Sequence, residues 1–174
     1  MHAVRSIALV GLSGAGKSTV ARLLAAHTTL PLIDTDVLLA KSAGRSIGEI
    51  FAADGEAGFR NLEAQALAQV LPAAPAIIAT GGGIVLLPAN RARLRDHAFV
   101  VWLDAPTAAL VARLLAHDEA RPLLNGNDPA VRLEALRTAR APLYAEVANL
   151  HIDTTARTAD EIAHEILAAA WNSP

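Results

Sequence analysis

The sequence predicts a single α/β domain in which helices cover both faces of a parallel sheet. Short apolar runs alternate along the chain with longer segments of helical periodicity, and this alternation is typical of parallel sheets with crossover helices. A length of 174 residues suits one domain with a substantial core. No repeat or low-complexity linker divides the chain, so we assign residues 1–174 to one domain.

The expected strands are short apolar runs, because strands that are buried on both faces are hydrophobic along most of their length. They are Ser6–Val10, Leu30–Ile33, Ala76–Ala79, Ala98–Leu103 and Leu150–Ile152. Helices are expected where apolar residues recur three and four positions apart. These segments are Thr19–His27, Glu56–Leu71, Pro106–His117, Ala130–Arg140 and Asp160–Trp171. Arg121–Pro129 is rich in Pro, Asn, Gly and Asp, which favours a loop.

The composition excludes several classes of protein. A net charge of -2 with only 3% aromatic residues argues against nucleic acid as a partner. The absence of cysteine rules out disulfides and zinc–thiolate sites and suits a cytoplasmic location. The apolar stretch at the N-terminus is only about five residues long, too short for a signal peptide. Residues 64–90 carry no charge, but prolines and glycines interrupt them, so we expect no membrane span.

A glycine-rich motif follows the first expected strand. Residues 11–19 read GLSGAGKST and match Gly-x4-Gly-Lys-Ser/Thr in the strand–loop–helix context that a P-loop requires. Glycines let successive backbone N–H groups converge on phosphate oxygens, and the following helix directs its positive dipole end at the same anion. The expected ATP-phosphate site is therefore formed by Gly14, Ala15, Gly16, Lys17, Ser18 and Thr19. In this motif the lysine reaches the β- and γ-phosphates and the serine hydroxyl binds Mg²⁺.

Other P-loop classes fit the chain poorly. GTPases need a guanine-reading Asn-Lys-x-Asp, and lysine occurs here only at positions 17 and 41. The apolar run at 76–79 is followed by Thr-Gly-Gly-Gly, which contains no acid for a second metal ligand. Asp34, at the end of the second expected strand, is therefore the candidate magnesium carboxylate.

Four further motifs lie outside the phosphate loop, namely Ile-Asp-Thr-Asp at 33–36, Gly-Phe-Arg at 58–60, Thr-Gly-Gly-Gly at 80–83 and Arg-Ala-Pro-Leu-Tyr at 140–144. Taken singly, each has a structural explanation as a helix cap, a surface arginine or a tight turn. Taken together, they place an aspartate and glycines at strand ends, where open α/β sheets bind ligands. Two arginines add planar forks that suit a carboxylate. The implied phosphoryl acceptor is a small hydroxylated acid.

In order and spacing these motifs, with Glu63 three residues after Arg60 and Arg-Pro-Leu-Leu at 121–124, resemble the signatures of shikimate kinases. The resemblance extends from about residue 6 to the last expected helix. It implies a three-layer α/β/α P-loop fold like that of nucleoside-monophosphate kinases, with a five-stranded parallel sheet. It also implies a substrate-binding region at about residues 34–62 and a lid at about residues 117–129.

The same resemblance implies a function and roles for particular residues. The activity would be transfer of the γ-phosphoryl group of ATP to the 3-hydroxyl of shikimate, on the route to chorismate and aromatic amino acids. Lys17, Asp36 and Arg121 would be catalytic, Ser18 would bind Mg²⁺, and Asp34 would support it through water. Shikimate would contact Asp36, Arg60, Gly81, Gly82, Gly83 and Arg140, with both arginines on its carboxylate. Arg113 and Arg157 would lie near the adenine, and we expect a monomer.

Two alternatives remain open from the sequence. The first is another small-molecule P-loop kinase, such as a gluconate kinase, which shares the glycine loop and phosphorylates a hydroxy acid. The second is a nucleotide-binding regulatory or chaperone-like protein that has kept the fold and lost the chemistry. A coupled ATPase assay with shikimate or gluconate separates these readings.

Overall fold

The core of the protein is a five-stranded parallel sheet with the strand order β2-β3-β1-β4-β5. The computed structural model describes residues 5–71, 73–116 and 128–172. The strands are β1 (Ser6–Val10), β2 (Leu32–Asp34), β3 (Ile77–Ala79), β4 (Ala98–Asp104) and β5 (Leu150–Asp153). Strand β2 begins two residues later than the sequence predicts and includes Asp34 as its last residue.

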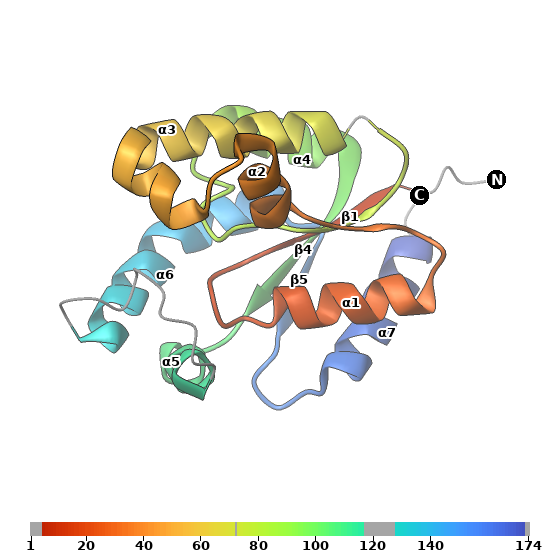
Figure 1. The fold of residues 1–174 in the computed structure, drawn as a ribbon. Helices are drawn as coiled ribbons and strands as arrows, with labels where there is room; N and C mark the ends of the chain where they lie inside the picture. The colour runs from red at the N-terminus through yellow and green to blue at the C-terminus, as the bar shows by residue number, and fades with distance from the viewer. Residues whose placement is uncertain (1–4, 72, 117–127, 173–174) are drawn as a thin grey trace.

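Helices cover both faces of the sheet, as Figure 1 shows. Helices α1 (Lys17–His27) and α7 (Ala159–Asn172) pack side by side on one face, and α3 (Ile47–Val70), α4 (Pro88–His97) and α6 (Pro129–Val147) lie on the other. Helix α2 (Thr35–Ala43) packs against α3, and α5 (Thr107–Ala116) packs against α6. The predicted three-layer α/β/α fold is confirmed. None of the helices within the described residues is long and apolar enough to span a membrane.

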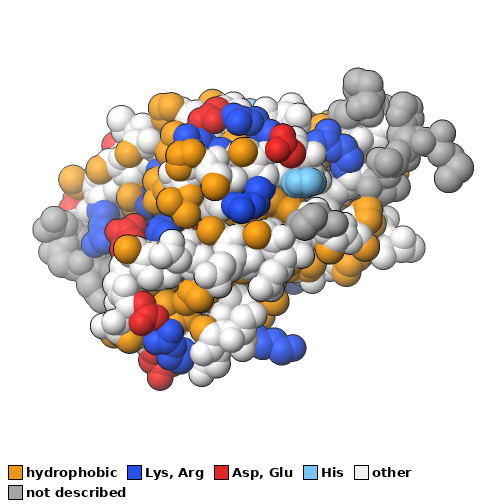
Figure 2. Space-filling view, turned by 90° about the horizontal axis from the view of Figure 1, so that it is seen from above, with side chains coloured by type: hydrophobic (Ala, Val, Ile, Leu, Met, Phe, Trp, Pro, Cys, Tyr) orange, Lys and Arg blue, Asp and Glu red, His pale blue; other side chains and the backbone are white. Residues whose placement is uncertain are grey.

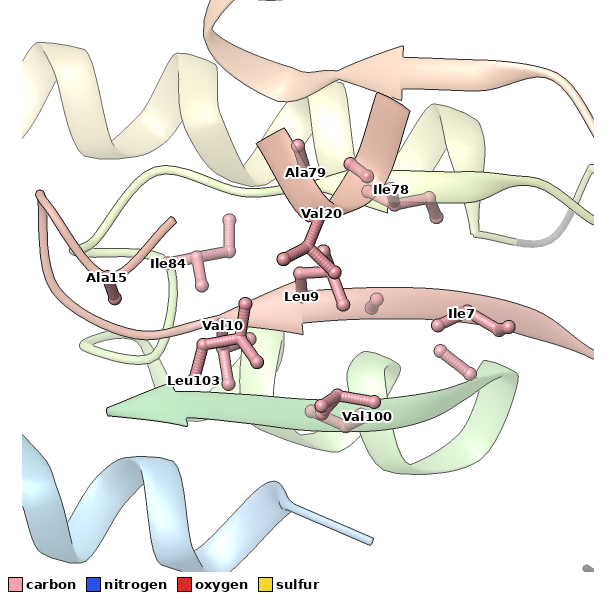
Figure 3. Packing of buried hydrophobic residues seen from close by; sticks show 14 of the residues in the cluster. Ile7, Leu9, Val10, Ala15, Val20, Ile78, Ala79, Ile84, Val100 and Leu103 are labelled. Atoms are coloured by element: carbon pink, nitrogen blue, oxygen red, sulfur yellow. The ribbon is translucent and has the colours of Figure 1, made fainter. Parts of the chain in front are cut away.

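The hydrophobic core surrounds β1, whose five residues are all buried. In the sheet Ile7 lies opposite Ile77 on one side and Phe99 on the other. Side chains of β1, β3 and β4 pack together with Val20 of α1, as Figure 3 shows. Full burial of one aliphatic side chain of this size contributes about 1.5–3 kcal/mol. The packing of β1 therefore fixes the loop that follows it.

Helices α2 and α4 are not among the helices that the sequence predicts. Helix α4 carries few apolar residues and buries only Asn90 and Leu94, so its periodic signal is weak. Helix α2 is short and follows β2 directly, and its buried residues are Thr35 and Leu39. Local capping and tertiary packing outweigh the weak pattern in both cases.

Two predicted helices, α3 and α6, are longer than expected by more than one turn. Helix α3 begins at Ile47 rather than Glu56, where Ser46 and Glu49 form a capping box, and it bends at Gly55, whose φ is +67°. Helix α6 continues beyond Arg140 and through Pro142 to Val147. A proline inside a helix removes one backbone hydrogen bond, so a boundary near Pro142 is the ordinary expectation.

The predicted substrate-binding region, residues 34–62, has a small hydrophobic cluster of its own. The cluster joins α2 to α3 and consists of Leu39, Ile50, Phe59 and Ala66. Most of the predicted lid, residues 117–127, lies outside the described residues.

Candidate active site

The phosphate loop connects β1 to α1, and its conformation depends on glycine. Gly11 has a φ of +138°, and a Cβ at this position would lie 2.2 Å from the carbonyl oxygen of Leu103. Only glycine allows the two backbone segments to approach this closely. Helix α1 begins at Lys17 after Gly16, and no side chain caps its first N–H groups. The helix end therefore presents backbone donors and a positive dipole end to an anion.

The first cavity, with a volume of about 420 Å³, lies between the phosphate loop, α5 and the beginning of α7. All six residues predicted to bind the ATP phosphates line it, and so do the two arginines predicted near the adenine. These eight lining residues are Gly14, Ala15, Gly16, Lys17, Ser18, Thr19, Arg113 and Arg157. We call this space the nucleotide cavity.

Arg113 is held in the nucleotide cavity by three hydrogen bonds. Its guanidinium donates to the hydroxyl and carbonyl oxygens of Thr154, both at 2.8 Å, and to the Gly14 carbonyl at 3.3 Å. Thr154 follows β5 directly, at the carboxyl end where ligands bind to such sheets. Its position at a strand end is the one hint that the sequence gives of Thr154, and it is a weak one. Arg157 instead pairs with Glu165 at 2.5 Å.

A second cavity of about 480 Å³ lies on the other side of the phosphate loop. We call it the acceptor cavity, and Lys17, Ser18, Asp34, Asp36, Gly81 and Gly82 are among its lining residues. Lys17 and Ser18 line both cavities. The Lys17 ammonium donates to the carbonyl oxygens of Gly11 at 2.8 Å and Leu12 at 2.9 Å. A ligand in either cavity therefore lies beside the same lysine and serine.

Asp34 caps a helix and also lines the acceptor cavity. One carboxylate oxygen, Oδ1, accepts hydrogen bonds from the backbone N–H groups of Asp36 at 3.0 Å and Val37 at 3.3 Å, so Asp34 is the N-cap of α2. The side chain also lies in the lining of the acceptor cavity together with Ser18. A carboxylate and a hydroxyl are hard oxygen donors, which fit Mg²⁺.

The three glycines after Thr80 allow charged side chains to approach the backbone. A Cβ on Gly81 would lie 2.8 Å from Asp36 Oδ1 and 2.9 Å from Glu63 Oε1. A Cβ on Gly82 would lie 3.6 Å from Arg140 Nη1, and one on Gly83 would lie 2.1 Å from Arg60 Nη1. Side chains from three distant parts of the sequence therefore meet around this glycine run.

Glu63 is a buried carboxylate beside the glycine run, with only 1% of its surface exposed. Arg60 Nη1 donates to Glu63 Oε2 at 2.9 Å, and Arg60 Nη2 lies 3.3 Å from Glu56 Oε1. Burial raises the pKa of Glu63, while the charge of Arg60 and its hydrogen bond oppose that rise. Within the described part of the chain, the buried atoms Glu63 Oε1 and Arg60 Nε have no hydrogen-bond partner. Such orphaned buried atoms are typical of a site that a ligand completes.

Tyr144, the last residue of the Arg-Ala-Pro-Leu-Tyr motif, fixes the glycine run from α6. Its hydroxyl donates to the Gly82 carbonyl at 2.5 Å. Burial raises the pKa of Tyr144 to about 12, against the opposing charge of Arg140. The phenol therefore stays protonated near neutral pH and remains a donor.

Six residues that line the acceptor cavity were not among the predicted site residues, namely Ser13, Arg22, Leu32, Val37, Ala79 and Thr80. Arg22 lines both cavities, while Leu32 and Val37 form an apolar part of the acceptor lining. Leu32 and Val37 are largely exposed for aliphatic residues. For Leu32 the available signal was its place two residues before Asp34, because alternate residues of a strand face the same side.

With one exception, the structure places the predicted site residues in these two cavities or around the glycine run. The exception is Arg121, which lies outside the described residues. Three of these residues are not in the lining of the acceptor cavity, namely Arg60, Gly83 and Arg140. They lie beside or in the glycine run, which does line it.

The comparisons with known proteins agree on one family. The shikimate kinase family model matches residues 13–171. A shikimate kinase of Symbiobacterium thermophilum is 46% identical over 163 residues, covering 93% of this chain and 94% of that one. A shikimate kinase from Acinetobacter baumannii, solved in complex with shikimate, is 36% identical with a TM-score of 0.89, covering 94% of this chain and 91% of that one.

A gluconokinase from Sinorhizobium meliloti is also similar, with a TM-score of 0.66 at 20% identity, over 98% of this chain and 94% of that one. At that identity the likeness shows a shared fold alone. The family model and the Symbiobacterium relative, by contrast, match almost the full length of the sequence. The chain therefore belongs to the shikimate kinase family.

Proposed function

We propose that this chain transfers the γ-phosphoryl group of ATP to the 3-hydroxyl of shikimate, giving shikimate 3-phosphate and ADP. One observation carries the proposal: two cavities of ligand size meet at Lys17 and Ser18. A phosphoryl donor in one cavity and an acceptor in the other would face each other across these residues. The product would serve the route to chorismate and aromatic amino acids.

Most of the catalytic contribution is positioning and neutralisation of charge, as in phosphoryl transfer generally. The backbone N–H groups at the start of α1 would hold the phosphates. The Lys17 ammonium would leave the carbonyl oxygens of its own loop and pair with the β- and γ-phosphates. Asp36, in the acceptor cavity, would orient the attacking hydroxyl and accept its proton. Arg121 would stabilise charge on the transferring group.

A kinase of this family uses ATP, which implies a divalent metal. We assign that metal as Mg²⁺, with the Ser18 hydroxyl as a direct ligand and Asp34 as a support through water. Their oxygen donors and their shared place in the acceptor cavity support this assignment. When bound, Mg²⁺ supplies positive charge next to the phosphate oxygens.

The acceptor is assigned as a carboxylic acid because of Arg60 and Arg140. Both guanidinium groups border the glycine run, and only 15% of the Arg60 side chain is exposed. Arg60 and Arg140 would bind the shikimate carboxylate, and Leu32 and Val37 would contact the ring. Glu63 would hold Arg60 in place. A cytoplasmic location and a monomeric state remain predictions.

A coupled assay of ADP release tests the function directly. Purified protein with ATP and Mg²⁺ should turn over with shikimate and should show only background rates with gluconate or without an acceptor. Turnover with gluconate but not with shikimate would show that the protein is a kinase of the other class. Nucleotide binding without turnover on either acid would favour the regulatory reading.

Replacing either arginine tests the carboxylate assignment. Arg60→Ala or Arg140→Ala removes one charge-assisted fork, a loss of about 1.5–3 kcal/mol, which corresponds to about 10- to 150-fold in shikimate affinity. The affinity for ATP should change little. Calorimetric titration of both variants measures this, with Arg45→Ala, an exposed arginine paired with Asp54, as the control. Unchanged shikimate affinity in both variants would contradict the assignment.

A further inference from the structure

Away from both cavities, two histidines and an aspartate gather where α1 and α7 pack together. His27 is the last residue of α1, and Asp160 and His164 lie one turn apart on α7. One potential ligand atom from each residue lies within 4.8 Å of the other two. The imidazole rings of His27 and His164 have centroids only 4.9 Å apart. All three residues are exposed, so the hydrophobic core does not depend on them. None of them lines the nucleotide cavity or the acceptor cavity.

The separations in the cluster suit a metal ion. His27 Nε2 lies 3.1 Å from Asp160 Oδ1, and His164 Nδ1 lies 3.3 Å from Asp160 Oδ2. Tetrahedral ligands at about 2.0–2.1 Å from a zinc ion are about 3.3 Å from one another. His164 Nδ1 also lies 2.9 Å from the Asp160 carbonyl oxygen, so this exposed ring must turn slightly to direct a nitrogen inward. Small side-chain rotations are enough to close the site.

Within residues 5–71, 73–116 and 128–172, no arginine or lysine pairs with the Asp160 carboxylate. Among the ion pairs of the described residues, Asp160 is paired only with the two histidines, whereas the nearby Arg157 is paired with Glu165. Exposed ion pairs contribute little to stability, so their rearrangement around an ion is weakly opposed. Two imidazoles and one carboxylate are typical ligands of Zn²⁺ and related first-row dications, and not of Mg²⁺.

We propose that His27, Asp160 and His164 form a surface site for a Zn²⁺-class transition-metal dication, with water completing the coordination. The ion would link the last residue of α1 to the first turns of α7. Ala159 and Ile162 of those turns line the nucleotide cavity. The site is separate from the Mg²⁺ that accompanies ATP, and it adds a metal-dependent link between two helices that otherwise pack through side chains.

Calorimetric titration of ZnCl₂ into the untagged protein, in a buffer free of nucleotide and chelator, tests the proposal. We expect one equivalent to bind, and His27→Ala and His164→Ala should each weaken that binding by at least about 10- to 100-fold. His97→Ala is the matched control, because His97 is likewise an exposed histidine at the end of a helix. It should bind Zn²⁺ as the wild type does.

Thermal unfolding gives a second readout that does not depend on activity. A free Zn²⁺ concentration about 100 times the Kd should raise the Tm of the wild type by about 5–10 °C relative to protein in EDTA. The two site variants should show the wild-type Tm in EDTA and little rise with Zn²⁺, and both should keep kinase activity with Mg²⁺. Absence of saturable Zn²⁺ binding, or binding that survives in both variants, would overturn the proposal and leave the cluster as a surface ion pair.

Discussion

Lys17 lies between two cavities and is held by two carbonyl oxygens of its own loop. Its replacement removes one donor from the charge that develops during transfer. Lys17→Ala should therefore fold and lose about 10²–10³ in kcat, because a single preorganised donor typically contributes that much. Lys41→Ala, the exposed lysine of α2, is the matched control. Steady-state kinetics decide the matter, and a Lys17→Ala enzyme within about threefold of wild type contradicts the role.

Glu63 makes stability depend on pH in a direction that follows from its burial. Its pKa in the folded protein is raised above the ordinary 4.5, so over a range beginning near 4.5 the folded state holds a proton that the unfolded chain has released. Because the folded state then binds more protons than the unfolded chain, the ionisation of Glu63 lowers the free energy of unfolding as pH rises through that range. Below the range Glu63 is protonated in both states and does not affect the free energy of unfolding.

Glu63→Gln removes this dependence. The free energy of unfolding of the variant, relative to wild type, should increase steadily as pH rises from 4.5. Urea denaturation at a series of pH values measures the difference. Glu56→Gln controls for the lost charge, since Glu56 pairs with the same arginine from an exposed position. A difference between Glu63→Gln and wild type that does not change with pH would show that burial does not control this carboxyl.

Individual site residues were easier to predict than the contacts that they make with residues distant in the sequence. The glycine loop, the two aspartates and the two arginines carry unusual residue types at fixed spacings, so the sequence identified them. The contact between Gly83 and Arg60, or the hold of Thr154 on Arg113, depends on how distant segments pack. Threonine at a strand end also has many ordinary roles, so Thr154 carried too little signal of its own.

At the scale of elements, the glycine run after β3 lets side chains from α2, α3 and α6 lie close to the backbone. Gly83→Ala would place a methyl group 2.1 Å from Arg60 Nη1, and the arginine end must move away. The variant should fold, because the displaced atoms belong to a flexible side chain, but shikimate KM should rise while ATP KM stays near wild type. Kinetics with each substrate varied in turn will show this split. Gly48→Ala in α3, where nothing lies within 4 Å of the added carbon, is the control.

Strands were predicted better than helices for a physical reason. A strand buried on both faces is recognisable from a few apolar residues, as β1 and β4 illustrate. Helix α4 carries few apolar residues and buries only two of its residues, so its pattern resembles a polar loop. Helix α6 passes through Pro142, and packing of Leu133, Tyr144 and Val147 holds together what local propensity would end.

Across the whole molecule, the predicted single domain should unfold in one cooperative step. The main hydrophobic core includes residues from the first strand to the last helix, so the elements that share it should lose their packing together. Tryptophan fluorescence reports on Trp102 in β4 and Trp171 in α7, and far-UV circular dichroism reports on the helices. The two urea transitions should coincide. Leu9→Ala in β1 should lower the free energy of unfolding obtained from each of them by about 2–5 kcal/mol. Separate midpoints would mean that the chain holds two independent units.

The charge distribution at this scale agrees with a small-molecule enzyme. On the face shown in Figure 2, acidic and basic side chains are interspersed and no broad basic field gathers. The sequence could state the net charge, but only the fold shows how the charges mix on a surface. The overall class was accessible from alternation of strands and helices, and the confirmed family from motifs whose order the fold then explains.

The central position of β1 divides the two halves of the site along the gene. Strands β2 and β3 lie on one side of β1. The acceptor residues between positions 32 and 83 belong to these two strands or to the segments that directly follow them. Strands β4 and β5 lie on the other side and lead to Arg113 and Thr154. Evolution toward a different hydroxy acid can therefore act on one contiguous stretch of coding sequence while the nucleotide half stays unchanged. Arg140 is an exception, because it belongs to α6 in the other half of the sequence. A change of acceptor that involves Arg140 therefore also requires a substitution in that half of the gene.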